Sequence, residues 1–115
     1  MMPQQQQQEQ APVLLLVDDA PSIHRLLAVK LKDEGLEFLA AFSGAEAIDL
    51  AQSQQPSLIL LDMNMPEMNG LETLTVLGRD YPRLPVIMFS NLTRRGAQTT
   101  LEALALGAKD YVTKP

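Results

Sequence analysis

Five polar residues of this sequence could carry out chemistry together, because each one ends or follows a short apolar run; they are Asp18, Asp19, Asp62, Ser90 and Lys114. Three carboxylates held close together repel one another, by about 4 kcal/mol per close pair at an effective dielectric near 20. A hard divalent cation relieves this repulsion, and carboxylate, water and carbonyl oxygens suit Mg²⁺. One carboxylate can then attack a phosphoryl group while a lysine and a hydroxyl contact its oxygens.

Each of these residues also has a structural explanation when it is taken singly. Asp18 and Asp19 could cap a helix, Asp62 could be a solvated loop acid, Ser90 could cap the next helix, and Lys114 could be a surface cation. These separate explanations leave unexplained why all five residues fall at the ends of apolar runs, so we favour a joint site. We expect Met63, Met65 and Met68 to pack and the single histidine, His24, to lie on the surface.

Strand and helix patterns alternate along the chain. The expected strands are 13–17, 36–42, 57–62, 86–90 and 108–112. The expected helices begin at Pro21, Ser43, Asn69 and Thr93; Gly35 and Gly107 are placed to end the first and the fourth, and the third runs towards Gly78. In the second helix, Ser43 and Glu46 form a capping-box pattern.

Five strands that alternate with four helices predict an α/β fold with a doubly wound parallel sheet. In such a sheet, ligands bind beyond the carboxyl ends of the strands, at the point where the strand order reverses. The five polar residues should therefore converge on one edge of the sheet.

Length, charge and composition exclude several other classes of protein. The 115 residues suit one domain, and the net charge of −5 with no basic stripe argues against direct nucleic-acid binding. No apolar run approaches the roughly 20 residues of a membrane span. The absence of cysteine fits a cytoplasmic protein. Residues 1–12, which include "QQQQQEQ", predict a disordered Gln-rich tail before a folded domain at 13–115.

The sequence resembles the receiver domain of two-component response regulators over nearly all of residues 13–115. The motifs that carry the resemblance are "VDDA" (17–20), "LDMNMPEMNG" (61–70), "FSNLT" (89–93) and "GAKDYVTKP" (107–115). The resemblance implies the flavodoxin-like strand order 2-1-3-4-5. It also implies a histidine kinase or histidine phosphotransfer protein as phosphoryl donor, and a downstream effector domain or protein.

The resemblance further implies roles for the acids. Asp62 matches the phosphoacceptor, and Asp19 matches the direct Mg²⁺ ligand. Asp18 matches the acid that acts on the metal partly through water. Asn64 matches the residue whose main-chain carbonyl binds the metal and whose side chain tunes hydrolysis of the phosphoaspartate.

Three further residues match the part of the family that responds to phosphorylation. Ser90 corresponds to the switch hydroxyl, Tyr111 to the switch aromatic, and Lys114 to the phosphate-pairing lysine before a proline, Pro115, that is usually cis. By this resemblance, Ser90 moves towards the phosphate and Tyr111 turns inward, which alters the face made by the fourth strand, the fourth helix and the fifth strand.

A narrower resemblance links residues 90–115 to receivers attached to chemotaxis protein-glutamate methylesterases, although Asn91 is bulkier than the residue usual there. Such an effector would lie outside this chain, which by itself is not expected to be an enzyme. Two alternatives stay open. One is an aspartyl-phosphate hydrolase, whose usual nucleophile motif has a second aspartate two residues after the first; Asn64 stands at that position and counts against this alternative. The other is a receiver-like docking module that is never phosphorylated.

The fifth helix of the family is missing from this sequence, which stops at Pro115. We therefore expect a piece of a longer regulator, with helices two, three and four on one side of the sheet and helix one alone on the other. One sheet face would then be partly uncovered, so the chain should be marginally stable or should associate with itself.

Overall fold

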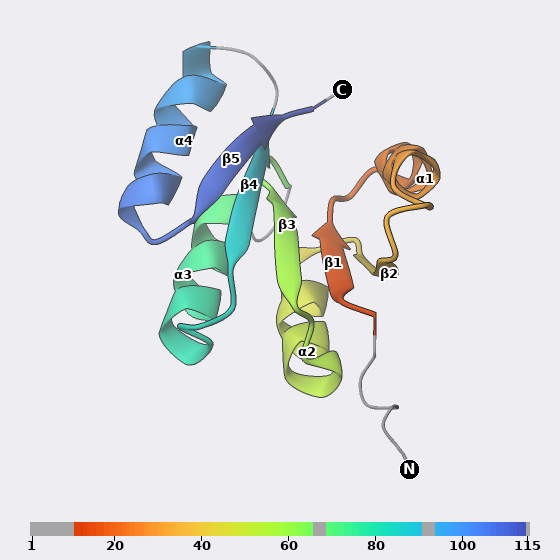
Figure 1. The fold of residues 1–115 in the computed structure, drawn as a ribbon. Helices are drawn as coiled ribbons and strands as arrows, with labels where there is room; N and C mark the ends of the chain where they lie inside the picture. The colour runs from red at the N-terminus through yellow and green to blue at the C-terminus, as the bar shows by residue number, and fades with distance from the viewer. Residues whose placement is uncertain (1–10, 66–68, 91–93, 115) are drawn as a thin grey trace.

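The computed structural model describes residues 11–65, 69–90 and 94–114, which form a parallel sheet of five strands. The strands are β1 (Val13–Val17), β2 (Glu37–Ala41), β3 (Leu58–Asp62), β4 (Val86–Ser90) and β5 (Asp110–Thr113). Their order is β2-β1-β3-β4-β5, and each neighbouring pair is parallel (Figure 1). The predicted fold class and strand order are confirmed.

Four helices connect the strands: α1 (Pro21–Lys30), α2 (Gly44–Gln54), α3 (Gly70–Asp80) and α4 (Arg94–Ala105). The main core lies between the sheet and α2, α3 and α4, where Leu15 and Ile59 of the sheet join Leu74 and Leu77 of α3. Helix α1 lies apart from the other three, beside β1 (Figure 1). The order β2-β1-β3 reverses the direction of winding at β1, which opens a crevice at the carboxyl ends of β1 and β3.

Side-chain caps fix where α2 and α3 begin, and these helices follow the carboxyl ends of β2 and β3. The Glu46 amide donates to Ser43 Oγ at 3.1 Å. The Glu46 carboxylate accepts from the Phe42 amide at 2.7 Å, whereas a capping box would use the Ser43 amide. At α3, Asn69 and Glu72 accept from each other's backbone amides, both at 3.0 Å, which is a complete capping box.

Several expected ends were wrong by a few residues. Helix α1 ends at Lys30, and a turn leads from there to Gly35. The φ of Gly35 is 74°, in the left-handed region that favours glycine. Gly78 lies inside α3, because that helix continues to Asp80. Strand β5 begins at Asp110, two residues later than the start of the expected strand 108–112. Helix α4 ends at Ala105, just before Gly107.

Some expectations fall outside the described residues. These are the tail over 1–10, the start of the fourth helix at Thr93, and the remarks on Met68, Asn91 and Pro115. Pro12, at the end of the expected tail, is described, and its carbonyl accepts from the Glu37 amide at 2.9 Å.

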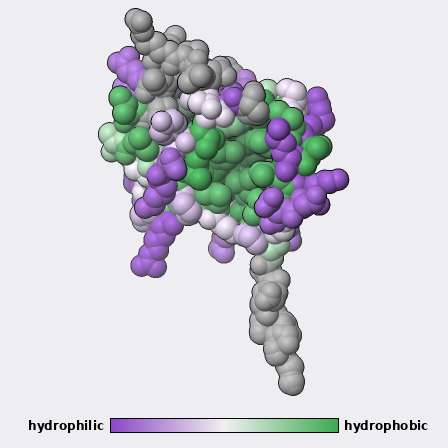
Figure 2. Space-filling model, turned by 45° about the horizontal axis from the view of Figure 1, so that its top comes forward, coloured by the Kyte–Doolittle hydropathy of each residue, from purple (hydrophilic) through white to green (hydrophobic). Residues whose placement is uncertain are grey.

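The second face of the sheet is only partly covered. Leu14 and Leu16 of β1 are buried, yet no residue of α1 is itself buried. We call the uncovered part the open strip, defined by Leu58, Leu60, Ile87 and Val112. Figure 2 shows apolar side chains gathered in a hollow that hydrophilic side chains flank. Among the described residues, helix α1 therefore covers this face alone, and incompletely.

Candidate functional site

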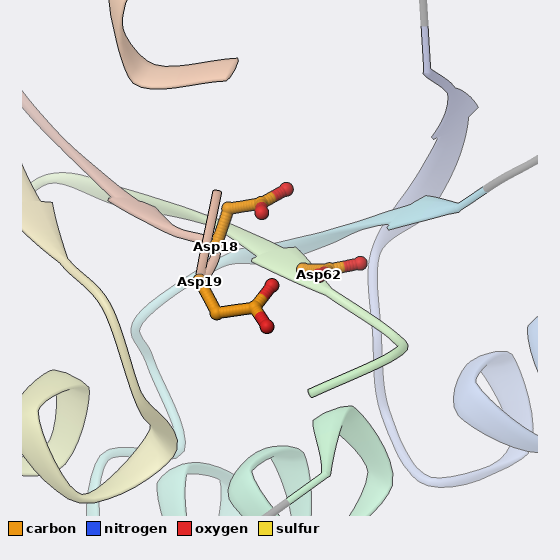
Figure 3. Close-up of side chains that lie close together, drawn as sticks. All are labelled: Asp18, Asp19 and Asp62. Atoms are coloured by element: carbon orange, nitrogen blue, oxygen red, sulfur yellow. The ribbon is translucent and has the colours of Figure 1, made fainter. Parts of the chain in front are cut away.

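Two neighbouring strands bring the three acids together. Asp18 and Asp19 follow β1, and Asp62 ends β3, which pairs with β1 in parallel register (Figure 3). One carboxylate oxygen from each acid lies within 4.8 Å of the others. Asp18 and Asp62 are fully buried, whereas Asp19 is exposed. The convergence expected at the crevice is therefore present in the geometry.

Lys114 lies between the two buried acids. Its Nζ is 3.1 Å from Asp62 Oδ1 and 3.2 Å from Asp18 Oδ2, and it stands 5.4 Å from the centre of the Phe89 ring. The Lys114 amide donates to the Ser90 carbonyl at 2.8 Å, which ties the end of β5 to the end of β4. A single ammonium thus partly neutralises two carboxylates, so the cluster keeps a net negative charge.

Burial and charge shift the pKa values of this pair in ways that the contacts explain. Burial raises the pKa of Asp62 above its ordinary 3.8, and repulsion from Asp18 adds to that rise; the Asn64 amide and Lys114 act in the opposite sense. Burial by itself lowers the pKa of Lys114, but the hydrogen bond and charge of Asp62, together with Asp18, outweigh it, so the net pKa is raised. Lys114 therefore stays protonated, and Asp62 holds its charge less readily than a surface aspartate.

Backbone amides orient the two buried carboxylates. The Ala20 amide donates to Asp18 Oδ1 at 2.8 Å, and the Asn64 amide donates to Asp62 Oδ1 at 3.2 Å. Asn64 is itself exposed, although its amide contacts the buried Asp62 carboxylate.

The remaining two predicted residues lie on β4, which pairs with β3, and on the edge strand β5. Ser90 is buried at the end of β4, and Asp62 pairs with its neighbour Phe89. Tyr111 lies on β5, and its side chain is 48% exposed, so it points outward here. The structure thus brings Lys114 into contact with the acids, whereas Ser90 and Tyr111 make no side-chain hydrogen bond to the acids among the described residues.

Two contributors to the site carried no clear signal in the sequence. Gly70 donates its amide to the Met63 carbonyl at 3.2 Å, and a Cβ at this position would stand 2.5 Å from the Asp62 carbonyl oxygen. His24, expected on the surface, is half-buried, and its Nε2 lies 2.8 Å from the Asp18 carbonyl oxygen. Both contacts depend on how helices meet strand ends. Met63 and Met65 are buried in the core, as expected.

The donor set fits a hard divalent cation. Among the described residues, Asp18 Oδ2 and Asp62 Oδ2 are buried carboxylate oxygens without a hydrogen-bond partner. Lys114 Nζ lies 3.2 Å from Asp18 Oδ2, and this ion pair compensates part of the charge of that carboxylate. Unpartnered buried carboxylate oxygens beside an exposed acid leave ligand positions that a cation with bound water suits.

The fold and site define a doubly wound α/β domain with an acid cluster and a lysine at its switch point, where such sheets bind ligands. The model of the response regulator receiver domain family matches residues 14–115, and the chain belongs to this family. Its place in two-component signalling follows from that membership.

Sequence relatives narrow the subgroup. The chain is 45% identical over 104 residues to a protein-glutamate methylesterase/protein-glutamine glutaminase of Trichodesmium erythraeum, which covers 89% of this chain and 30% of that protein. The protein of the same name from Archaeoglobus fulgidus is 44% identical over 103 residues, again with 89% of this chain and 29% of that protein covered. The chain thus spans less than a third of the length of these curated relatives, and it is homologous to their receiver part.

Solved structures agree with the family. The chemotaxis protein CheY4 of Vibrio cholerae matches with a TM-score of 0.82 and 31% identity, over 92% of this chain and 88% of that one. The receiver domain of NtrX from Brucella abortus matches with a TM-score of 0.81 and 34% identity, over 89% and 85%. Among the described residues, no helix is long and apolar enough to cross a membrane.

Proposed function

We propose that this receiver domain accepts a phosphoryl group on Asp62 and changes the face made by β4, α4 and β5 in response. One observation carries the proposal. The carboxylate of Asp62 ends β3 in the crevice, where Lys114 contacts its Oδ1 and Oδ2 has no hydrogen-bond partner among the described residues. A buried carboxylate with one oxygen held and the other unpaired suits a nucleophile.

In the proposed reaction, an Asp62 oxygen forms a bond to phosphorus while the bond from phosphorus to the donor breaks. With a phosphohistidine donor, the imidazole nitrogen leaves with the electron pair. The Asn64 amide and Lys114 orient the attacking carboxylate. After transfer, Asp62 is an acyl phosphate without its carboxylate charge, so the lysine ammonium can pair with the phosphoryl oxygens.

Asp18, Asp19 and Asp62, with the main-chain carbonyl of Asn64, are the residues proposed to hold Mg²⁺. Bound there, the cation neutralises charge on the transferred phosphoryl group. The exposed position of Asp19 leaves it free to bind directly, while Asp18 is engaged by Lys114 and the Ala20 amide. This difference supports Asp19 as the direct ligand and Asp18 as the acid that acts partly through water.

Ser90 and Tyr111 are proposed to pass the change to the surface. Ser90 is buried at the end of β4. It follows Phe89, which pairs with Asp62 of β3, so Ser90 lies on the strand next to the proposed phosphoacceptor. Tyr111 lies on the edge strand β5 and is half exposed. An inward turn would remove an aromatic ring from the surface of that edge.

The donor is proposed to be a histidine kinase or a histidine phosphotransfer protein, and the protein is proposed to act in the cytoplasm. The similarity to methylesterase relatives supports a chemotaxis methylesterase as the effector. Catalysis of that kind would reside outside these 115 residues, and the chain by itself is proposed not to be an enzyme.

Treatment with acetyl phosphate and Mg²⁺, followed by intact mass measurement, tests the proposal. Wild type should gain one phosphoryl group, and Asp62→Ala should gain none. Asp49→Ala, which removes an exposed acid from α2, is the matched control and should label like wild type. Equal labelling of wild type and Asp62→Ala, or labelling that survives chelation of the metal, would overturn the assignment.

A further inference from the structure

His24 of helix α1 makes one contact with the acid cluster and one with the residue that follows β2. Its Nε2 lies 2.8 Å from the main-chain oxygen of Asp18, and its ring centroid is 4.4 Å from that of Phe42, the residue after β2. A carbonyl oxygen can only accept a hydrogen bond, so Nε2 carries the hydrogen. The ring therefore connects α1 with the ends of both β1 and β2.

The contact falls on the peptide unit that joins the two acids of the cluster. The Asp18 amide donates to the Ala41 carbonyl at 3.1 Å, and Asp18 Oδ1 accepts from the Ala20 amide at 2.8 Å. His24 holds the third polar group of this residue, its carbonyl. Asp19 follows directly and is exposed, so the direction in which it projects depends on how this peptide is held.

Helix α1 has few other anchors. None of its residues is buried, in contrast to α2 and α3, each of which buries several. Apolar packing therefore restrains α1 weakly, and a polar contact at the end of its first turn has more influence on where the helix lies. A change at His24 should be felt in the loop between β1 and α1 before it is felt in the core.

We propose that His24 is a positioning residue for the metal site. It contacts neither the metal nor the phosphoryl group; its Nε2–H holds the Asp18–Asp19 peptide in the orientation that directs both carboxylates toward Asp62. The inference rests on the proposed binding of Mg²⁺ at these acids. The outer contacts of a metal site commonly set its affinity in this way.

Two substitutions separate the hydrogen bond from the packing of the ring. His24→Phe keeps an aromatic ring beside Phe42 and removes the donor. His24→Gln removes the ring but places an amide nitrogen the same number of bonds from Cα as Nε2. Mg²⁺ affinity, measured by NMR titration, should fall about threefold to tenfold in His24→Phe, the effect of one net hydrogen bond, and should recover in His24→Gln.

The outcomes are distinct. If His24→Phe binds Mg²⁺ as wild type does, or if both variants are equally weakened, the proposal is overturned. If wild type itself binds no Mg²⁺, it is the proposed function that fails. Should His24→Phe not fold, the ring tautomer of wild type decides: nitrogen NMR should show the hydrogen on Nε2, and a hydrogen on Nδ1 would overturn the proposal.

Discussion

Asp18 and Asp19 are adjacent in sequence but lie in different surroundings. Asp18 is buried and already paired with Lys114 and the Ala20 amide, whereas Asp19 is exposed. We expect Asp19→Asn to weaken Mg²⁺ binding more than Asp18→Asn, because the less engaged carboxylate gives the direct bond. Titration followed by tyrosine fluorescence or NMR measures both. A larger loss in Asp18→Asn would reverse the two roles, and a tight site that prefers zinc would contradict the Mg²⁺ assignment altogether.

The raised pKa of Asp62 predicts how stability depends on pH. Between the ordinary value of 3.8 and the raised folded value, the folded state binds more protons than the unfolded state, so the free energy of unfolding falls as pH rises. At neutral pH, Asp62→Asn should therefore be more stable than wild type. A gain on the order of 1 kcal/mol is expected, the scale of one unsatisfied buried polar group.

This gain should shrink as pH falls and vanish below about 3.8, where Asp62 is neutral in both states. Urea unfolding of wild type and Asp62→Asn across this pH range measures it. Asp33→Asn, which changes an exposed acid in the turn after α1, is the control and should differ little from wild type. A gain that is independent of pH would mean that charge burial is not its source.

Helix α3 begins against the end of β3, and Gly70 permits that approach. A Cβ at Gly70 would stand 2.5 Å from the Asp62 carbonyl oxygen and 2.7 Å from Met63 Cα. Both atoms belong to the backbone, so the clash cannot be relieved by a side-chain rotation. We expect Gly70→Ala to destabilise the chain by roughly 1–3 kcal/mol or more, and to slow labelling of Asp62 by acetyl phosphate.

Gly78 of the same helix provides the comparison. Within the part of the chain that the structure describes, a Cβ there would meet only the Leu106 carbonyl oxygen, at 3.8 Å, which is ordinary contact. Gly78→Ala should therefore raise stability by up to about 1 kcal/mol, because alanine is the better helix former, and should leave labelling unchanged. Urea unfolding and intact mass of the two variants test the pair; equal behaviour would show that the contact between Gly70 and β3 is unimportant.

At the scale of the whole molecule, the open strip of Leu58, Leu60, Ile87 and Val112 should make the 115-residue chain associate with itself. Val112→Lys, at a side chain that is 44% exposed, should reduce light scattering at high protein concentration. Val29→Lys introduces the same charge at a more exposed valine of α1 and is the control. If both variants reduce scattering equally, added charge is the cause and the strip is not.

The effect of covering the open strip with the family's fifth helix also stays a prediction. Urea unfolding of the 115-residue chain, compared with a chain extended by a native fifth helix, measures what cover of the strip contributes. Burial of each large apolar side chain is worth about 1.5–3 kcal/mol. The extended chain should be the more stable of the two, and equal stability would show that cover of the strip contributes nothing.

The sequence by itself determined which elements form and where the acids lie along them. The continuous apolar runs specify buried parallel strands, and the capping residue Ser43 specifies a helix start. Because the carboxyl ends of parallel strands share one edge, Asp18, Asp62 and Lys114 could be assigned to a common crevice before any contact was known. Signals of this kind depend on residues close together in the chain, so they can be read from the sequence.

Only the tertiary structure decided how these residues contact one another. Lys114 pairs with both buried acids, Asp19 stays exposed beside them, and His24 reaches the Asp18 carbonyl. Each fact depends on the register of strands far apart in the chain, or on the approach of a helix to a strand end. A surface histidine and a contact histidine look alike in sequence, because spacing along one element says nothing about what a second element places opposite it.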